Sequence, residues 1–243
     1  MKLLLILVVL ASNIVWGEWI EPPARSAKRH RVPTPDYVPV FPRDHGSHPG
    51  HGIEWWYWVG HLNAVDSEKK FGFQSTIFRL AGDPEKSGVT QSEPFGNQNL
   101  FLVHTALSDF EEEKYIHHER VMREGWQARS SEKTLSLTVG GVKVNLLEEE
   151  DGHKVVTRYP DGAKLELTFK PTKPLVSFGD RGLSRKGADP ASVSWYWSYT
   201  RLQAKGTLFQ NGEEIAVEGI AWMDHEISSS QLGEDLAGWD WTC

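Results

Sequence analysis

Paired glycine-containing turns divide much of this chain into short runs of alternating polarity. Alternating segments flank three dipeptides, Gly140-Gly141, Asp161-Gly162 and Asn211-Gly212. Residues of these types adopt the positive φ angles that a two-residue hairpin requires. Because successive side chains of a strand point to opposite faces, each run can bury one face against a core. The turns therefore predict antiparallel hairpins.

Three further segments have the composition of strands, namely Glu54–Ala64, Phe71–Leu80 and Asn99–Asp109. In the second of them, the alternation places Phe71, Phe73, Ser75 and Ile77 on one face. Helical periodicity is absent except in Phe110–Gly125, where a short helix and a solvated loop both fit. Many short hairpin-linked strands fit a sandwich or an up-and-down barrel. The aromatic excess favours a barrel of about eight strands with a ligand in its mouth.

The N-terminal region has the features of a secretory leader followed by an irregular arm. Lys2 precedes an apolar run, and Val15 and Gly17 supply the small residues expected before a cleavage site. We therefore expect a signal peptide over residues 1–17, a Pro/Gly-rich arm over 18–50 and a barrel domain over 51–243. The expected location is secreted or periplasmic, without a stable membrane anchor. Since Cys243 is the only cysteine, burial alone has to hold the fold together.

Charge and motifs exclude several classes of function. The formal net charge is −7 and basic residues form no long run, so a nucleic-acid partner is not expected. We find no nucleotide-binding glycine loop, and so expect no nucleotide and no cofactor. The sequence has no serine nucleophile elbow and no free cysteine in a position to act as a nucleophile. Both absences argue against serine and cysteine hydrolases. Eleven tryptophans indicate an aromatic-lined cavity as well as a core, although any single tryptophan can simply be a core residue. The expected partner is a hydrophobic small molecule, and the oligomeric state stays open.

The stretch AWMDHEISSS contains the first candidate site. In a strand, Trp222, Asp224 and Glu226 share one face, whereas His225 lies on the other. If the carboxylate face is enclosed, at least one pKa rises and that group can act as a general acid. If the face is open to water, both carboxylates are ordinary surface charges. The sequence does not decide between these interpretations.

A second candidate is the run SVSWYWSYTRL. Alternation places one set of residues on a single face: Trp195, Trp197, Tyr199 and Arg201. Tyr196, Ser198 and Thr200 form the opposite face. A row of aromatic rings can stack on a flat ligand or stabilise a cation. An ordinary core face explains the row equally well.

Histidines at every third position mark a third candidate, since His45, His48 and His51 are followed by Glu54. Histidine and glutamate are zinc ligand types. However, the intervening Gly and Pro residues fit no regular element that would aim all four side chains inward. We therefore predict no metal, and expect these residues to cap the end of the barrel.

Five segments in this order resemble one protein family: FPRDHGSHPGHGIEWWYWVGHL, FGFQSTIFR, HTALSD, WYWSYTRLQAKGTL and VEGIAWMDHEISSSQLGEDLAGWDW. They are similar to the AttH-like proteins, which carry the label of secreted hydrolases and are related to carotenoid 1,2-hydratases. The resemblance covers about residues 40–241. It implies two lipocalin-like barrels in tandem, of which this chain would be the first, cut short at its C-terminal end.

The resemblance also implies roles for individual residues. Asp224 matches the acid that protonates an isoprenoid double bond in the hydratases, and Trp197 matches one of their tryptophans. Trp222 stands where they have a tyrosine and Trp195 where they have a histidine; Glu226 replaces an amide. The candidate catalytic residues are Asp224, His225 and Glu226. The candidate ligand-binding residues are Glu54, Trp56, Trp195, Tyr196, Trp197, Tyr199 and Trp222.

Three functions remain open at this stage. The first is acid-assisted hydration, dehydration or cyclisation of a double bond in an isoprenoid-like molecule. The second is a carrier that binds an apolar ligand without changing it. The third is a hydrolase in which Asp224 or Glu226 activates a water molecule.

Overall fold

The computed structural model describes residues 19–84, 99–147, 152–230 and 237–238. The expected leader, residues 1–17, lies outside the described residues. The first element is a short 3-10 turn, η1 (Arg43–His45). The strands are β1 (Ile53–Ala64), β2 (Lys70–Leu80), β3 (Leu100–Asp109), β4 (Lys114–Arg123), β5 (Ala128–Ser130), β6 (Ser136–Val139), β7 (Val142–Leu146), β8 (His153–Arg158), β9 (Lys164–Pro171), β10 (Val176–Ser177), β11 (Ser184–Arg185), β12 (Val193–Gln210) and β13 (Glu213–Ser228).

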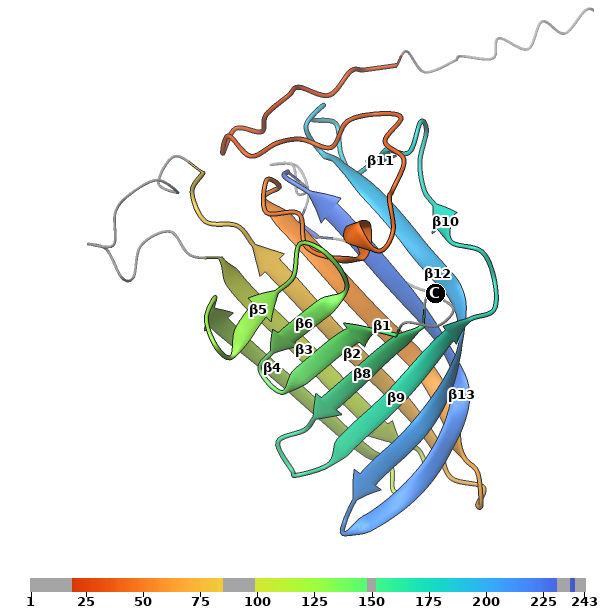
Figure 1. Ribbon diagram of the computed structural model, residues 1–243. Helices are drawn as coiled ribbons and strands as arrows, with labels where there is room; N and C mark the ends of the chain where they lie inside the picture. The colour runs from red at the N-terminus through yellow and green to blue at the C-terminus, as the bar shows by residue number, and fades with distance from the viewer. Residues whose placement is uncertain (1–18, 85–98, 148–151, 231–236, 239–243) are drawn as a thin grey trace, which may run out of the picture.

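The strands form an antiparallel, nearly closed, lipocalin-like barrel (Figure 1). Their order is β4-β3-β2-β1-β13-β12-β9-β8-β7-β6-β5, and the short strands β10 and β11 pair with β12 beside this path. The prediction of an all-β barrel is confirmed, with eleven strands in the path instead of about eight. Because β1 pairs with β13 along its whole length, the two ends of the barrel sequence meet in the middle of the sheet.

Two of the three predicted hairpin turns are confirmed. Gly140 and Gly141 have φ angles of 54° and 102° between β6 and β7, and Asn211 and Gly212 have 53° and 83° between β12 and β13. Both pairs have the positive angles of a tight hairpin. The third prediction is wrong in length: the Tyr159 N–H donates to the Ala163 carbonyl at 2.9 Å, so the loop between β8 and β9 is longer than two residues.

Residues Phe110–Gly125 form neither a helix nor a solvated loop. Most of this segment is β4, which pairs with β3 from Lys114 to Arg123. Ile116 and Met122 pack against the barrel core, while most other side chains of the strand are exposed. The charges that suggested a helix or loop occupy the solvent side of this end strand, where charges oppose further strand pairing.

The core fills the inside of the barrel with large side chains from alternating positions. Trp56 and Trp58 of β1 are fully buried, as are Phe71 and Ile77 of β2. The predicted shared face of Phe71, Phe73, Ser75 and Ile77 is confirmed, since all four are buried. Burying one such apolar side chain contributes about 1.5–3 kcal/mol to stability, which suits a fold that relies on burial.

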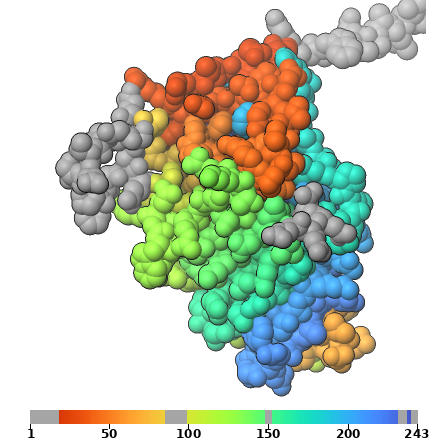
Figure 2. Space-filling view, in the orientation of Figure 1, coloured from red at the N-terminus to blue at the C-terminus, as the bar shows by residue number. Residues whose placement is uncertain are grey.

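The N-terminal arm, residues 19–52, lies across one end of the barrel (Figures 1 and 2). Tyr37 stacks on Trp195 of β12 with ring centroids 3.9 Å apart. The Ser47 N–H donates to the Ser131 carbonyl at 2.8 Å. These contacts bring the arm histidines to the mouth of the barrel. No helix within the described part of the chain has the length and apolar character that a membrane crossing requires.

Candidate functional site

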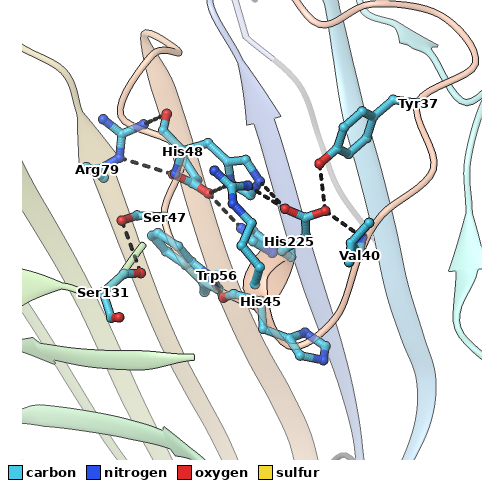
Figure 3. A network of polar contacts seen from close by, with 12 residues as sticks. Tyr37, Val40, His45, Ser47, His48, Trp56, Arg79, Ser131 and His225 are labelled. Atoms are coloured by element: carbon cyan, nitrogen blue, oxygen red, sulfur yellow. Dashed lines mark hydrogen bonds and ion pairs between the residues drawn. The ribbon is translucent and has the colours of Figure 1, made fainter. Parts of the chain in front are cut away.

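Glu54 is the centre of a buried polar network at the barrel mouth, and Figure 3 labels its partners His48, Arg79 and His225. It lies on the inner face of β1. Its Oε1 is 2.7 Å from His48 Nδ1 and 2.8 Å from His225 Nε2. Its Oε2 accepts hydrogen bonds from Arg79 Nε at 3.1 Å and from the His48 backbone N–H at 2.8 Å. One carboxylate therefore joins the arm, β1, β2 and β13.

Asp44 of η1 extends this network toward the arm. Its Oδ2 accepts hydrogen bonds from the Tyr37 hydroxyl and from the Val40 backbone N–H, both at 2.6 Å (Figure 3). Its Oδ1 lies 3.2 Å from His48 Nε2 and also pairs with Arg43. His48 thus stands between two buried carboxylates, one at each ring nitrogen.

The charges of this network compensate one another. Burial alone would raise the pKa of Glu54, but hydrogen bonds from His225 and His48 and the charge of Arg79 hold it well below its ordinary value. Burial would lower the pKa of His48, yet its bonds to Asp44 and Glu54 raise it. We therefore assign His48 as a cation between two anions, a hydrogen-bonded arrangement that makes buried charges tolerable.

Three members of the network have the residue types of a metal site. Ligand atoms of His48, Glu54 and His225 lie within 4.8 Å of one another, and two histidines with one carboxylate can hold iron. However, His48 Nδ1 and His225 Nε2 both lie at hydrogen-bond distance from Oε1 of Glu54. Arg79 already supplies a positive charge to that carboxylate. We therefore interpret the group as a hydrogen-bonded network.

An aromatic wall adjoins the network inside the barrel. Trp195, Trp197 and Tyr199 share the inner face of β12, in register with Ile227, His225 and Met223. Trp56 stacks on the His225 ring, with centroids 4.8 Å apart and an angle of 24°. Trp197 meets the same ring edge-on at 5.2 Å. Six predicted residues therefore meet here: Glu54, Trp56, Trp195, Trp197, Tyr199 and His225.

Arg201 does not belong to this wall, although alternation placed it there. The register of β12 against β13 shifts between Tyr199 and Leu202. Such a β-bulge inserts one residue, so Leu202 takes the inner position and Arg201 is exposed. The sequence contains no glycine at this position that would have signalled the bulge.

Asp224 and Glu226 lie on the opposite, outer face of the same strand. The Trp222 indole N–H donates to Asp224 Oδ1 at 2.6 Å, and the Ser198 hydroxyl contacts the same oxygen. Lys186 Nζ pairs with Glu226 Oε1 at 2.8 Å and lies 4.5 Å from the centre of the Tyr196 ring. The outer cluster is therefore Lys186, Tyr196, Ser198, Trp222, Asp224 and Glu226.

Both carboxyls of the outer cluster are almost fully buried, with 2% and 3% of Asp224 and Glu226 exposed. Burial raises the pKa of Asp224, against the opposing hydrogen bonds from Ser198, Trp222 and Tyr196. Burial also raises the pKa of Glu226, against Lys186, and the charge of Asp224 raises it further. The two groups are thus biased toward the protonated form, unlike Glu54 and Asp44.

The predicted site residues therefore form two groups on opposite sides of one strand. His225 faces the inner wall, whereas its neighbours Asp224 and Glu226 face outward with Trp222 and Tyr196. Sequence reasoning missed Asp44, Arg79 and Lys186. Arg79 could have been found, because it continues the inward alternation of β2 after Ile77. Nothing in the sequence signals that Lys186 reaches Glu226.

The AttH-like family model matches residues 32–243, which include the arm from Val32 onward, η1 and all the strands. The chain belongs to the AttH-like family. A crystal structure described as an AttH protein from Nitrosomonas europaea is similar to this AttH-like chain, with 32% identity and a TM-score of 0.70. The similarity covers 84% of this chain and 59% of that one.

Kievitone hydratase from Nectria haematococca shares the fold at 14% identity, with a TM-score of 0.55 over 86% of this chain and 57% of that one. The AttH-like chain thus spans less than three fifths of the length of each of these two proteins. A search of curated proteins finds no match.

Proposed function

We propose that this AttH-like chain is part of a secreted enzyme that hydrates, dehydrates or cyclises a double bond of a hydrophobic, isoprenoid-like molecule. The observation that carries the proposal is the burial of Asp224 among the Trp222 indole, the Tyr196 phenol and the Ser198 hydroxyl, with its pKa raised. A carboxyl that keeps its proton near neutral pH can serve as a general acid.

Asp224 supplies the proton in the first step. The Trp222 N–H and the Ser198 hydroxyl both donate to Oδ1, and Tyr196 also hydrogen-bonds this carboxyl. Transfer of this proton to an alkene carbon breaks the double bond and leaves a carbocation on the neighbouring carbon. The rings of Trp222 and Tyr196 belong to the same cluster, and aromatic faces stabilise cations.

Glu226 completes the reaction as the base. It stands two residues along the same face. Its ion pair with Lys186 opposes the burial that raises its pKa, so the carboxyl can take up the proton that water releases. Water attacks the carbocation and gives one proton to Glu226, so that alkene and water become an alcohol. Proton transfer from Glu226 to Asp224 restores the starting state, and the reverse sequence is dehydration. Without water, attack by a second double bond on the carbocation closes a ring and moves the positive charge to another carbon, which then loses a proton to Glu226 to give the cyclic alkene.

Two further observations support this proposal. Kievitone hydratase, which shares the fold, is named for adding water to its substrate. The sequence of residues 1–17 has the features of a secretory leader, which supports export.

Deuterium incorporation tests the proposed acid. The purified protein is incubated with geraniol or lycopene in deuterium oxide, and products are examined by mass spectrometry. We expect deuterium on carbon together with gain or loss of water, abolished by Asp224→Asn and retained in the exposed control Asp66→Asn. Labelling that survives Asp224→Asn would remove Asp224 as the acid.

Further assays of the same protein separate the carrier and the hydrolase from this enzyme. A carrier quenches tryptophan fluorescence on binding and returns the isoprenoid unlabelled. A hydrolase cleaves esters, and cleavage that persists in both Asp224→Asn and Glu226→Gln would exclude this carboxyl pair from the chemistry.

A further inference from the structure

Inside the barrel, five ring nitrogens are buried without a hydrogen-bond partner among the described residues. They are both ring nitrogens of His45, Nε2 of His153, Nε1 of Trp197 and Nδ1 of His225. We call these four residues the interior histidine cluster. They come from η1, β8, β12 and β13, and lie apart from the outer cluster around Asp224.

Ring contacts join the four residues into one group. The rings of His45 and His153 lie 5.6 Å apart, and those of Trp197 and His225 lie 5.2 Å apart. Phe41 links the two pairs, at 4.1 Å from His45 and 6.3 Å from Trp197. The unpartnered nitrogens therefore belong to one aromatic-lined region of the barrel.

Such a concentration of unsatisfied groups calls for an explanation. Each buried donor or acceptor without a partner costs about 1–3 kcal/mol, and folded proteins contain few of them. The chain satisfies both ring nitrogens of His48 nearby, where the same residue type is equally buried. Unpaired atoms grouped on neighbouring rings need partner atoms from a bound molecule, which is either ordered water or a ligand.

The existing hydrogen bonds fix what most of these atoms offer. The Trp58 indole donates to His153 Nδ1 at 3.4 Å, so the His153 proton sits on Nε2, which is a donor. His225 Nε2 donates to the Glu54 carboxylate, so His225 Nδ1 is a bare acceptor. The Trp197 indole can only donate. His45, when neutral, adds one donor and one acceptor.

The cluster also lacks charge. Burial lowers the pKa of His45 to about 3 and that of His153 to about 3. Burial likewise lowers the pKa of His225, against its bond to Glu54. All three imidazoles are therefore neutral at neutral pH, and a charged ligand would find no opposite charge within the cluster.

We propose that the interior histidine cluster is a binding site for the hydroxyl group of an uncharged, aromatic or unsaturated small molecule. A hydroxyl offers one donor and two acceptor positions, which complement the acceptor of His225 and the donors of His153 and Trp197. The rings of Phe41 and Trp197 contact the carbon skeleton. This site is independent of the proposed chemistry at Asp224, which lies on the opposite face of β13.

Three probes of similar size test this inference. Phenol carries the hydroxyl, toluene lacks it and benzoate is charged. Each is titrated into the protein, with the indole N–H signal of Trp197 and the imidazole signals of His153 and His225 followed by NMR. We expect phenol to shift these signals and to bind about tenfold more tightly than toluene or benzoate, as one or more hydrogen bonds to a ligand imply.

A conservative variant isolates one donor. Trp197→Phe keeps an aromatic ring but removes the N–H, and we expect it to weaken phenol binding roughly three- to tenfold. Trp55→Phe, on the outer face of β1, is the matched control and leaves the affinity unchanged. The NMR signals also report the tautomers of His153 and His225 in the unmodified protein, independently of whether any variant folds.

Two results would overturn the inference. One is equal affinity for phenol and toluene. The other is contact of the Trp197 N–H with water alone, with no response to phenol, which would make the cluster a site of structural hydration. Asp224→Asn should leave phenol binding intact, so loss of turnover in that variant and loss of this site are distinguishable.

Discussion

At the scale of single residues, adjacent positions in β13 have opposite environments. Asp224 has its pKa raised on the outer face, while His225 next to it has its pKa lowered on the inner face. The sequence correctly grouped the residues that share a face, because alternation is a property of the strand itself. It could not say which face is covered, since Lys186 and Tyr196 enclose the outer side from elsewhere in the chain.

Glu54 should contribute strongly to stability. In Glu54→Gln the buried guanidinium of Arg79 and the His48 cation lose their shared carboxylate. Removing one partner of a buried ion pair typically costs about 3–5 kcal/mol. Urea denaturation should show a loss of this size. Glu166→Gln, at a more exposed pair with Lys164, should cost less than about 1 kcal/mol, and an equal loss in both variants would contradict the assigned role.

The buried neutral histidines should make the fold sensitive to mild acid. His45 and His153 have pKa values lowered to about 3, so between roughly pH 6.5 and 3 the unfolded chain binds more protons than the native one. Their contribution is fully present above pH 6.5 and is lost as the pH falls. His153→Gln should flatten the fall of unfolding free energy between about pH 6.5 and 4.5, whereas the exposed His61→Gln should not.

Asp224 should be destabilising at neutral pH. A carboxyl with a raised native pKa favours folding at low pH, and this contribution is lost as the pH rises through its native pKa. Asp224→Asn retains an oxygen that accepts from Trp222 and Ser198, so it should raise the unfolding free energy at pH 7 but not at pH 3. A variant that is less stable than the parent at both pH values would contradict the shift.

At the scale of elements, local turn chemistry predicted more than charge patterns did. Gly140-Gly141 and Asn211-Gly212 form the expected turns because their backbone preferences act within two residues. The charges of β4 suggest a helix or a loop, but they reflect the place of this strand at the end of the sheet path. Only the fold determines that place. The bulge after Tyr199 arises from pairing with β13 and has no local signature.

Close packing of the strands leaves no room for a Cβ at Gly206. A Cβ on Gly206 of β12 would lie 1.8 Å from the Glu166 carbonyl of β9, so Gly206→Ala has to push two paired strands apart. Overpacking of this kind costs about 1–3 kcal/mol or more. Thermal unfolding should show the loss, whereas Gly125→Ala, whose Cβ would meet nothing within 4 Å, should be nearly neutral.

At the scale of the molecule, the arm is what turns an open barrel end into an enclosed site. It contributes Asp44, His45 and His48. The three-residue spacing marks His45, His48 and Glu54, but nothing in the sequence links them to Asp44 or Arg79. The sequence therefore predicted the barrel and the candidate residues, but not the network they form. The network forms because the irregular N-terminal arm crosses the mouth of the barrel. Residue propensities and strand alternation do not predict the path of that arm.

Removing the arm should affect the interior of the barrel as well as its surface. A chain that starts at residue 53 loses the partners of Glu54 in the arm and exposes Trp195 and Trp197, so we expect binding of an apolar dye and loss of near-ultraviolet circular dichroism. Asp36→Asn releases only the exposed contact with Arg181 and is the control. Unchanged spectra in the truncated chain would show that the arm is dispensable.

The pairing of β1 with β13 also sets an order of events during synthesis. The strand that carries Glu54 emerges early from the ribosome, but its second neighbour, with His225, is among the last described segments to be made. Until then β1 presents an unpaired edge, and contacts so distant in sequence form slowly. A nascent chain of this kind keeps that edge open until the hairpin of β12 and β13 arrives, so the edge has to be shielded from other strands during translation.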